Sequence, residues 1–421
     1  MRTWAELDNA AKIFPCTSNA DRRNLFRLSF YMTEDVDPAL LQKALASTIE
    51  RFRVFKVRLR AGFFWYYLEE NKRIPKVRKE DPYLLAPIDR TENDGYLFRI
   101  TYYRKKISME VFHSLTDGYG AMQFLKALVY SYLHLHGYEI DSEGLILSES
   151  ESVYEEAQDS FQKLYDEAIR PDSSENAARL ITGTPYDDGW IGMITGTAPR
   201  EKFKELITRY DCSYTQFLTA ALTYTASQVP HLFKKKKKEL PFQVFIPVDI
   251  RKRFETKTLR NFSMVMRTSI MPDPALPFSE YVRIAKEQIT LAASDEYFLP
   301  RVYSNIRSEK NFLLRIVPLF LKNIVMRAVY NRLSARADSI CVSNLGDPML
   351  PRQMQPFVRR VIFSNGAMKS APINLGVTYY GDEIHMNFTA SIVERDFQKH
   401  FFRLLTGLGL PITLETNDLE D

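Results

Sequence analysis

The chain has 421 residues, of which 45% are hydrophobic and 26% are charged, and its formal net charge is +5. The composition is that of a globular protein, and the length exceeds what one ordinary core supports, so we expect two or three domains. A net charge this small for the length argues against nucleic acid as a partner.

The first half of the chain mixes strand patterns with helix patterns. After Pro38, the apolar residues Leu41, Leu45, Ile49 and Phe52 recur at helical spacing, which predicts an amphipathic helix. Short apolar, aromatic or β-branched runs predict strands at 27–32, 54–59, 63–68, 100–103 and 107–112.

The last of these strands runs into the hexapeptide from His113 to Gly118, after which apolar residues again recur at helical spacing. His113 therefore falls on a turn from strand to helix, where a rigid scaffold can hold a polar side chain in place. A neutral imidazole there can take a proton from a substrate. The same residues also suit a plain helix start, because Thr116 or Asp117 is a good N-cap and Gly118 suits a tight turn.

Residues from about 141 to 185 are acidic, rich in serine and then punctuated by Pro and Gly, which predicts a linker. Beyond it, strands are predicted at 191–197, 242–248, 262–271, 339–344, 358–364, 373–380 and 383–389. Helices are predicted from Pro199 onward and at 213–222, 278–292, 312–333 and 394–408. The sequence thus predicts an α+β (mixed α/β) fold of two lobes, 1–185 with the His113 motif and the linker, and 186–421.

The most apolar stretch runs from Phe312 to Val329 and is broken by Arg315, Lys322, Asn323 and Arg327. No stretch of the chain is apolar for long enough to span a bilayer, so we expect no transmembrane segment. We expect the periodic apolar residues here to face the core. The alternative is a helix that lies on a membrane surface.

One dense basic run, Lys234 to Lys238, lies between a helical segment and a strand, which predicts a solvated loop. The alternative is a contact to the phosphates of an anionic cofactor. The three cysteines, Cys16, Cys212 and Cys341, have no CxxC spacing, so they predict neither a disulfide framework nor a zinc site. With no apolar signal sequence at the start, we expect a cytoplasmic protein.

Several motifs follow one another along the chain: Val36-Asp37-Pro38 with Ala44-Leu45, His113 to Gly118, Pro247 to Arg251, Arg260-Asn261-Phe262, and Val342 to Gly346. In these motifs the chain resembles the CoA-dependent acyltransferase superfamily. That superfamily includes chloramphenicol acetyltransferase, peptide-synthetase condensation domains and alcohol acyltransferases, and the single HxxxDG motif is nearest to bacterial alcohol acetyltransferase-like proteins. The resemblance implies two chloramphenicol-acetyltransferase-like lobes with a tunnel between them. Phe112 replaces the first histidine of the family's frequent pair, which points away from peptide-bond condensation domains.

Acyl transfer from a thioester needs a base as the new bond forms, and His113 is the predicted base. Because the acceptor attacks directly, no Ser or Cys nucleophile is required, and we expect no covalent acyl-enzyme. The resemblance implies that Asp117 pairs with Arg251 from the other lobe and holds the turn in shape. Gly118, which has no Cβ, permits a ligand to approach the backbone closely, or is merely a turn residue.

The negative charge that develops on the thioester oxygen needs a hydrogen-bond donor. Our candidate is Ser343, with Asn344 second, although Ser-Asn-Leu-Gly is equally typical of a turn that ends a strand. Asn261 is expected to fix a backbone segment near the tunnel. No HExxH or equivalent spacing is present, so no metal is expected.

The sequence therefore predicts an acyltransferase, with O-acylation expected, that moves an acyl group from acyl-CoA or a carrier-protein thioester to a hydroxyl or amine of a small or lipophilic acceptor. No permanently bound cofactor is expected, since acyl-CoA is a co-substrate. One alternative is an amide-forming condensation enzyme of a natural-product pathway, served by an acyl carrier protein in trans. Another is a binding member of the fold that makes no product.

Overall fold

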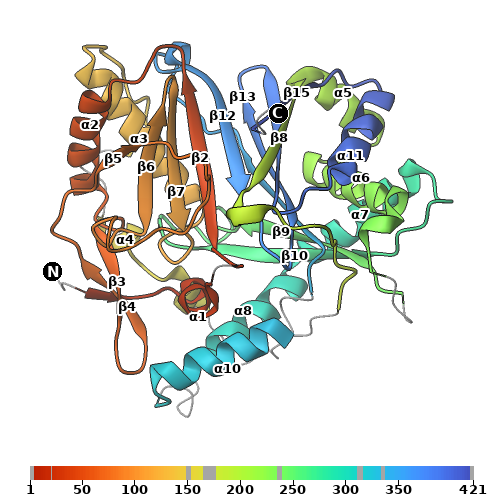
Figure 1. The fold of residues 1–421 in the computed structure, drawn as a ribbon, viewed down its shortest axis with the longest axis horizontal. Helices are drawn as coiled ribbons and strands as arrows, with labels where there is room; N and C mark the ends of the chain where they lie inside the picture. Colours follow the sequence, from red (N-terminus) through yellow and green to blue (C-terminus); the bar gives the residue numbers. More distant parts are fainter. Residues whose placement is uncertain are drawn as a thin grey trace.

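The computed structural model describes residues 4–19, 21–147, 153–164, 177–234, 239–310, 316–332 and 337–417. Two large sheets stand side by side, each covered by helices on its outer face (Figure 1). This is the predicted mixed α/β architecture of two lobes.

The first lobe is built on a five-stranded sheet whose two strands β2 (Leu25–Met32) and β7 (Lys106–Phe112) are almost wholly buried. Its order is β12 (Val358–Asn365), β2, β7, β6 (Phe98–Tyr103) and β5 (Val77–Lys79). One face of this sheet packs against two helices, α2 (Pro38–Arg51) and α3 (Gly118–Leu135). Asp37 caps α2 and Pro38 begins it, so its start is local sequence chemistry.

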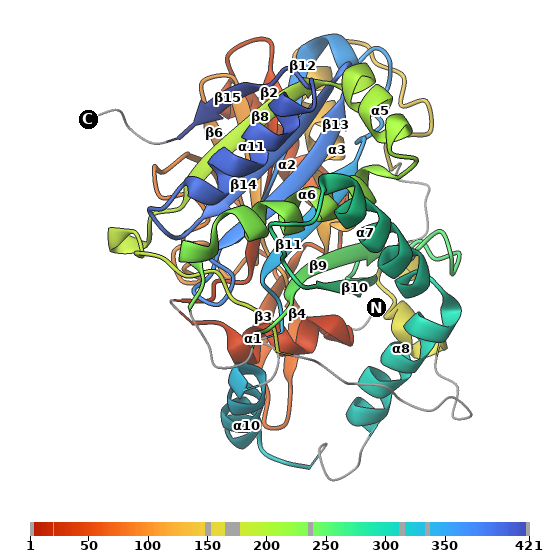
Figure 2. The same cartoon turned by 90° about the vertical axis from the view of Figure 1, so that its right-hand side faces the viewer.

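The second lobe is built on a seven-stranded mixed sheet. Its order is β10 (Ser263–Ile270), β9 (Phe242–Asp249), β11 (Ile340–Gly346), β13 (Ile373–Tyr380), β14 (Glu383–Ala390), β8 (Gly192–Pro199) and β15 (Thr413–Thr416). The covering helices are α5 (Arg200–Arg209), α6 (Tyr214–Gln228), α7 (Phe278–Ala292) and α11 (Asp396–Gly407). Figure 2 shows α6 and α11 across the face of this sheet, where they bury its largest apolar core.

Strand β12 joins the two lobes. It comes late in the chain, yet it pairs antiparallel with β2 along its whole length. On its other side it contacts the second sheet, where a Cβ at Gly376 would lie 2.4 Å from the carbonyl oxygen of Phe363. The first sheet is therefore completed by the second half of the chain. A division at residue 185 would leave β12 in the second segment of the sequence, although the strand belongs to the first sheet.

A third, smaller sheet and three helices lie below the main sheets in Figure 1. They are β1 (Trp4–Glu6), β3 (Val57–Ala61), β4 (Tyr66–Glu70), α1 (Ile13–Thr17), α8 (Asp295–Lys310) and α10 (Leu319–Arg332). The core-facing prediction for the stretch that holds α10 is wrong in its described part. Most of its large apolar residues face solvent, because Lys322 and Asn323 occupy the side that faces the protein. Among the described residues, no helix has the length and apolar character needed to cross a membrane.

Part of the predicted linker is docked on the first lobe. Residues 153–164 form α4 (Val153–Glu156) and a 3₁₀ turn, and the rest of the acidic, serine-rich tract at 148–152 and 165–176 lies outside the described residues. The buried carboxylate of Glu156 accepts hydrogen bonds from two guanidinium nitrogens of Arg51, at 2.6 and 2.9 Å. Its backbone carbonyl accepts a 2.8 Å hydrogen bond from the N–H of Leu259, so this segment ties α2 to the second lobe.

Replacing Arg51 by Met should lower the free energy of unfolding by about 3–5 kcal/mol, because Glu156 is then left as a buried carboxylate without its cation. Arg58→Met is the matched control. Arg58 also pairs with a carboxylate, but its side chain is 36% exposed, so its loss should change stability by less than about 1 kcal/mol. Denaturant unfolding measures both changes, and equal changes would contradict a structural role for the docked segment.

Candidate active site

The backbone of His113 is fixed from two sides. Its N–H donates to the carbonyl oxygen of Asn24 at 3.0 Å, and its own carbonyl accepts from the amide nitrogen of Asn261 at 3.0 Å. Asn24 has φ of +50°, a left-handed conformation that asparagine adopts more readily than most residues. The turn between β7 and α3 is therefore held by segments from both halves of the chain.

The imidazole of His113 lies between two aromatic rings. The ring of Phe14 is stacked on it with centroids 4.9 Å apart, and the ring of Phe26 is tilted against it at 4.6 Å. Among the described residues, no group hydrogen bonds to its buried Nδ1 atom. Burial lowers the pKa of His113 to about 4, and the nearby Asp117 and Asn261 oppose this shift only in part. The imidazole is therefore neutral at physiological pH, which is the form that accepts a proton.

The carboxylate of Asp117 joins the two lobes. It caps α3 by accepting from the N–H of Gly120 at 3.2 Å. It also accepts hydrogen bonds from Nη2 of Arg251 at 3.0 and 2.9 Å and from the N–H of Phe262 at 2.9 Å. The helix cap, which the sequence offered as a plain interpretation of the turn, and the ion pair, which the resemblance implied, are two uses of one carboxylate. A single guanidinium nitrogen, Nη2 of Arg251, contacts both carboxylate oxygens of Asp117. In a bidentate pair, two guanidinium nitrogens would each contact one oxygen.

Arg251 is held in place independently of Asp117. Its Nε donates to the carbonyl oxygen of Thr258 at 2.8 Å, and its Nη1 donates to Asp249 at 2.9 Å. The guanidinium also lies 4.5 Å from the ring centroid of Tyr119, in the first turn of α3. The side chains of Arg251 and Asp117 are only 4% and 8% exposed, so the charge pair is shielded from solvent.

Two glycines follow the histidine, and the structure gives them different neighbours. A Cβ at Gly118 would lie 2.6 Å from a methyl carbon of Leu345, a flexible side chain of the second lobe. A Cβ at Gly120 would lie 2.3 Å from the carbonyl oxygen of Leu259, which is backbone. The close approach of the lobes therefore depends more strictly on Gly120, which the sequence analysis missed. Its place in the first turn after the motif is the signal that could have found it.

The other predicted site residues divide into two groups. Asn261 reaches the turn and also donates to the buried carboxylate of Asp8 at 3.2 Å; burial raises the pKa of Asp8 to about 7. Asn344 instead donates to the hydroxyl of Tyr379 at 2.6 Å, and it does not line the cavity around His113. Ser343 is buried in β11 and does not line that cavity either.

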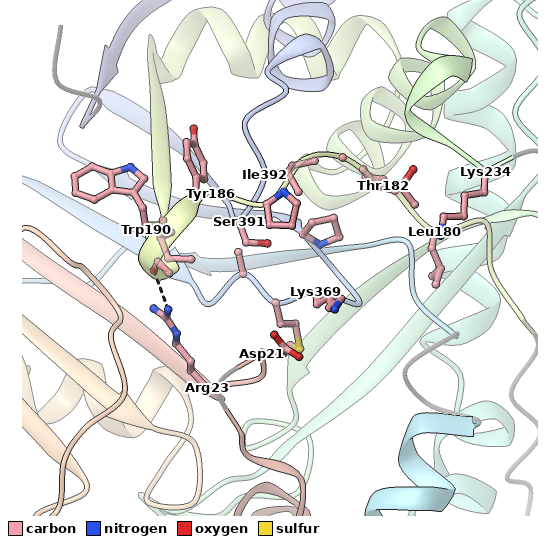
Figure 3. Close-up of a pocket in the computed structure, with 18 of the residues that line it drawn as sticks. Asp21, Arg23, Leu180, Thr182, Tyr186, Trp190, Lys234, Lys369, Ser391 and Ile392 are labelled. Atoms are coloured by element: carbon pink, nitrogen blue, oxygen red, sulfur yellow. Dashed lines mark hydrogen bonds between the residues drawn. The ribbon is translucent and has the colours of Figure 1, made fainter. Parts of the chain in front are cut away.

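Two adjoining cavities lie at the junction of the lobes. The inner one has a volume of about 200 Å³ and is lined by His113 together with residues of α1, α10 and β11. The outer one, of about 1190 Å³, shares Arg23, Ile191, Ala367 and Met368 with it. The basic residues that line the outer cavity are Arg23, Arg179, Lys234 and Lys369, against the acidic Asp21 and Glu239. In Figure 3, the guanidinium of Arg23 donates to the backbone carbonyl oxygen of Gly189, next to Trp190 at the wall of this cavity.

Cys341 also lines the inner cavity, and burial raises its pKa well above the ordinary value of a thiol. A thiol that stays protonated is a poor nucleophile. Among the described residues, no group of three or more His, Cys, Asp or Glu side chains is placed to hold a metal ion. The inner cavity thus offers one neutral imidazole and mainly apolar or amide side chains, with Arg23 and Asp338 as its charged residues.

Comparison with known proteins agrees with the motifs. Residues 198–399 match the family model described as alcohol acetyltransferase. No curated protein sequence matches the chain.

Three solved structures share the fold over nearly the whole chain. Polyketide synthase associated protein 5 from Mycobacterium tuberculosis has a TM-score of 0.59 at 10% identity, covering 95% of this chain and 96% of that one. TRI101 of F. sporotrichioides, solved with coenzyme A and T-2, has a TM-score of 0.59 at 10% identity, covering 99% and 100%. The starter condensation domain of rhizomide synthetase, a mutant solved with C8-CoA and Leu-SNAC, has a TM-score of 0.57 at 15% identity, covering 96% and 94%.

The fold that the resemblance implied is confirmed. The chain has the fold of CoA-dependent acyltransferases and condensation domains, with two lobes of that type. Its second lobe carries the sequence pattern of alcohol acetyltransferases.

Replacing Asp117 by Asn should lower the free energy of unfolding by about 3–5 kcal/mol, because Arg251 loses the carboxylate that neutralises it in the buried junction. Asp249→Asn is the matched control. Asp249 contacts the same guanidinium, but its side chain is 42% exposed, so the expected loss is below about 1 kcal/mol. Denaturant unfolding compares the two variants, and losses of similar size would contradict the assignment of Asp117 as the main partner of Arg251.

The lowered pKa of His113 predicts how the charge of its ring changes in acid. The ring should stay neutral until the pH falls through about 4, whereas a histidine in the unfolded chain takes up its proton near 6.5. The contribution of His113 to folding stability should therefore decrease as the pH falls from 6.5 towards 4, while the folded ring stays unprotonated; the raised pKa of Asp8 contributes with the opposite sign over the same range. NMR titration of the His113 imidazole at pH values where the protein is folded measures this directly. A midpoint near 6.5 would contradict the account of the ring's burial.

Proposed function

We propose that this protein transfers an acyl group from acyl-CoA to a hydroxyl group, with His113 as the general base. The observation that carries the proposal is the neutral imidazole of His113 at the wall of a cavity between the lobes, on a turn held by Asp117 and Asn261. We place the enzyme in the cytoplasm, because its three cysteines are all unpaired.

In the reaction, the acceptor oxygen attacks the thioester carbonyl while its proton passes to the imidazole. The tetrahedral intermediate then collapses, the C–S bond breaks, and the imidazolium returns the proton to the leaving thiolate. The products are an ester and free CoA thiol, and the base ends neutral as it began. The protonated state of Cys341 supports direct attack by the acceptor over a covalent acyl-cysteine.

Two further roles belong to this proposal. The hydroxyl of Ser343 is our candidate donor to the carbonyl oxygen in the transition state. It lies two residues after Cys341 in β11, and alternation along a strand puts the two on the same face. The anionic part of CoA is proposed to occupy the outer cavity, where Arg23, Arg179 and Lys369 supply positive charge. Lys234 lines this cavity too, and the rest of its basic run, 235–238, lies outside the described residues.

His113→Ala should reduce transfer by about 10²- to 10⁴-fold, the usual contribution of a positioned general base. Release of free thiol from several acyl-CoAs, measured with a panel of alcohols and amines, gives the rate. His231→Ala is the matched control, because His231 is 58% exposed and does not line either cavity, so its rate should equal that of the wild type.

The same assay separates the alternatives. Thiol release with amines alone, or with a carrier-bound donor alone, would favour an amide-forming condensation enzyme. No release with any donor, from a protein that binds CoA, would favour a binding member of the fold. Wild-type turnover in the His113 variant, with its unfolding midpoint unchanged, would rule out His113 as the base.

A further inference from the structure

Helix α10 has its polar residues towards the protein and its apolar residues towards solvent. The side that faces the protein carries Lys322, whose ammonium donates to the carbonyl oxygen of Phe64 at 2.9 Å and lies 3.3 Å from the ring centroid of Trp65. Next to it, the amide of Asn323 donates to the hydroxyl of Tyr66 at 3.0 Å. A lysine that is 6% exposed has thus taken the inward position that an apolar residue of an amphipathic helix normally holds.

The outward side of α10 is apolar. Phe320 and Ile324 are 65% and 64% exposed, which are large fractions for such side chains. The tip of the hairpin between β3 and β4 extends this surface, since the N–H of Leu319 donates to the carbonyl oxygen of Phe63 at 2.8 Å. Figure 1 shows the hairpin and α10 together at the lower end of the molecule. We call the whole surface the apolar face; its exposed residues are Phe63, Phe64, Ile316, Phe320, Leu321, Ile324, Val325 and Val329.

The charged residues of α10 all have one sign. Between Leu319 and Arg332 there is no Asp or Glu, and the basic residues are Lys322, Arg327 and Arg332. Of these, Arg327 and Arg332 are exposed. An apolar helix face flanked by arginines and without acidic residues matches the boundary of an anionic lipid leaflet, where chains accept the apolar residues and headgroup phosphates accept the guanidinium groups.

We propose that the apolar face docks this protein on a membrane that carries anionic phospholipids. Helix α10 lies in the plane of the surface, with Phe320, Ile324 and Phe63 at the level of the upper acyl chains and Arg327 and Arg332 against phosphates. A second copy of the chain fits this surface less well. Symmetric pairing of the same face would bring arginines of one copy towards those of the other.

The docked helix is also a wall of the candidate active site. Tyr330, on the inward side of α10, lines the inner cavity with His113, and the guanidinium of Arg22 lies 4.0 Å from its ring centroid. Docking therefore places the cavity one helix away from the lipid. This step rests on the proposed function, and it implies an acceptor or acyl chain that is held in the bilayer rather than in water.

Flotation of the purified full-length protein with vesicles tests the docking. The probes are phosphatidylcholine vesicles, with and without one part in three of phosphatidylserine. The wild type should float with the anionic vesicles, less with the neutral ones, and less in high salt. A double variant, Phe320→Glu with Ile324→Glu, should partition at least about tenfold more weakly, because two large apolar groups no longer enter the lipid. Leu291→Glu is the matched control, since Leu291 is 67% exposed but lies on α7, and its binding should be unchanged.

Three results would overturn the proposal: no flotation of the wild type with anionic vesicles, an equal loss in Leu291→Glu, or a dimer in light scattering that the double variant abolishes while vesicles do not bind. Thiol release with a water-soluble donor and acceptor, without vesicles, is measured in parallel. If the proposed function fails, flotation is unaffected. If docking fails, thiol release in water still proceeds, so the two failures are distinguishable.

Discussion

The junction between the lobes depends on the carboxylate of Asp117. It ends the strand-to-helix turn of the first lobe as the cap of α3, and it binds Arg251 and the backbone of Phe262 in the second lobe. A buried ion pair is often no more stabilising than apolar packing of the same volume. It is favourable only in a narrow range of geometries, and removing one partner leaves the other as a buried, uncompensated charge. This pair therefore holds the His113 turn against the second lobe, in addition to the strand β12 that the two lobes share.

The chemistry of His113 follows from that junction. The turn holds the imidazole against Phe14 and Phe26 and away from solvating groups, so the ring stays neutral. The same burial makes it a weaker base than an exposed histidine. The proposed proton transfer then depends on position, which Asn261 and Asp117 supply by holding the backbone and the helix start.

The sequence predicted most long elements, because apolar periodicity is a local signal, and the resemblance carried by the ordered motifs implied the pairing of Asp117 with Arg251. The sequence did not predict β1, β5, β15 or α8; the strands are short, and α8 contains Pro300. Asn344 was given a possible role at the site, but it hydrogen bonds to Tyr379, a contact that only the pairing of β11 with β13 creates. The apolar side of α10 was expected to face the core, since periodicity shows that a helix has an apolar face but not what that face contacts.

The Asp117 and Arg251 pair couples the two lobes and thereby positions His113. A double-mutant cycle of Asp117→Asn and Arg251→Gln tests this coupling, with the unfolding free energy and the rate of thiol release both measured. The expected coupling energy in stability is about 1–3 kcal/mol, and the double variant should be no slower than the worse single variant. Additive effects on both quantities would contradict it.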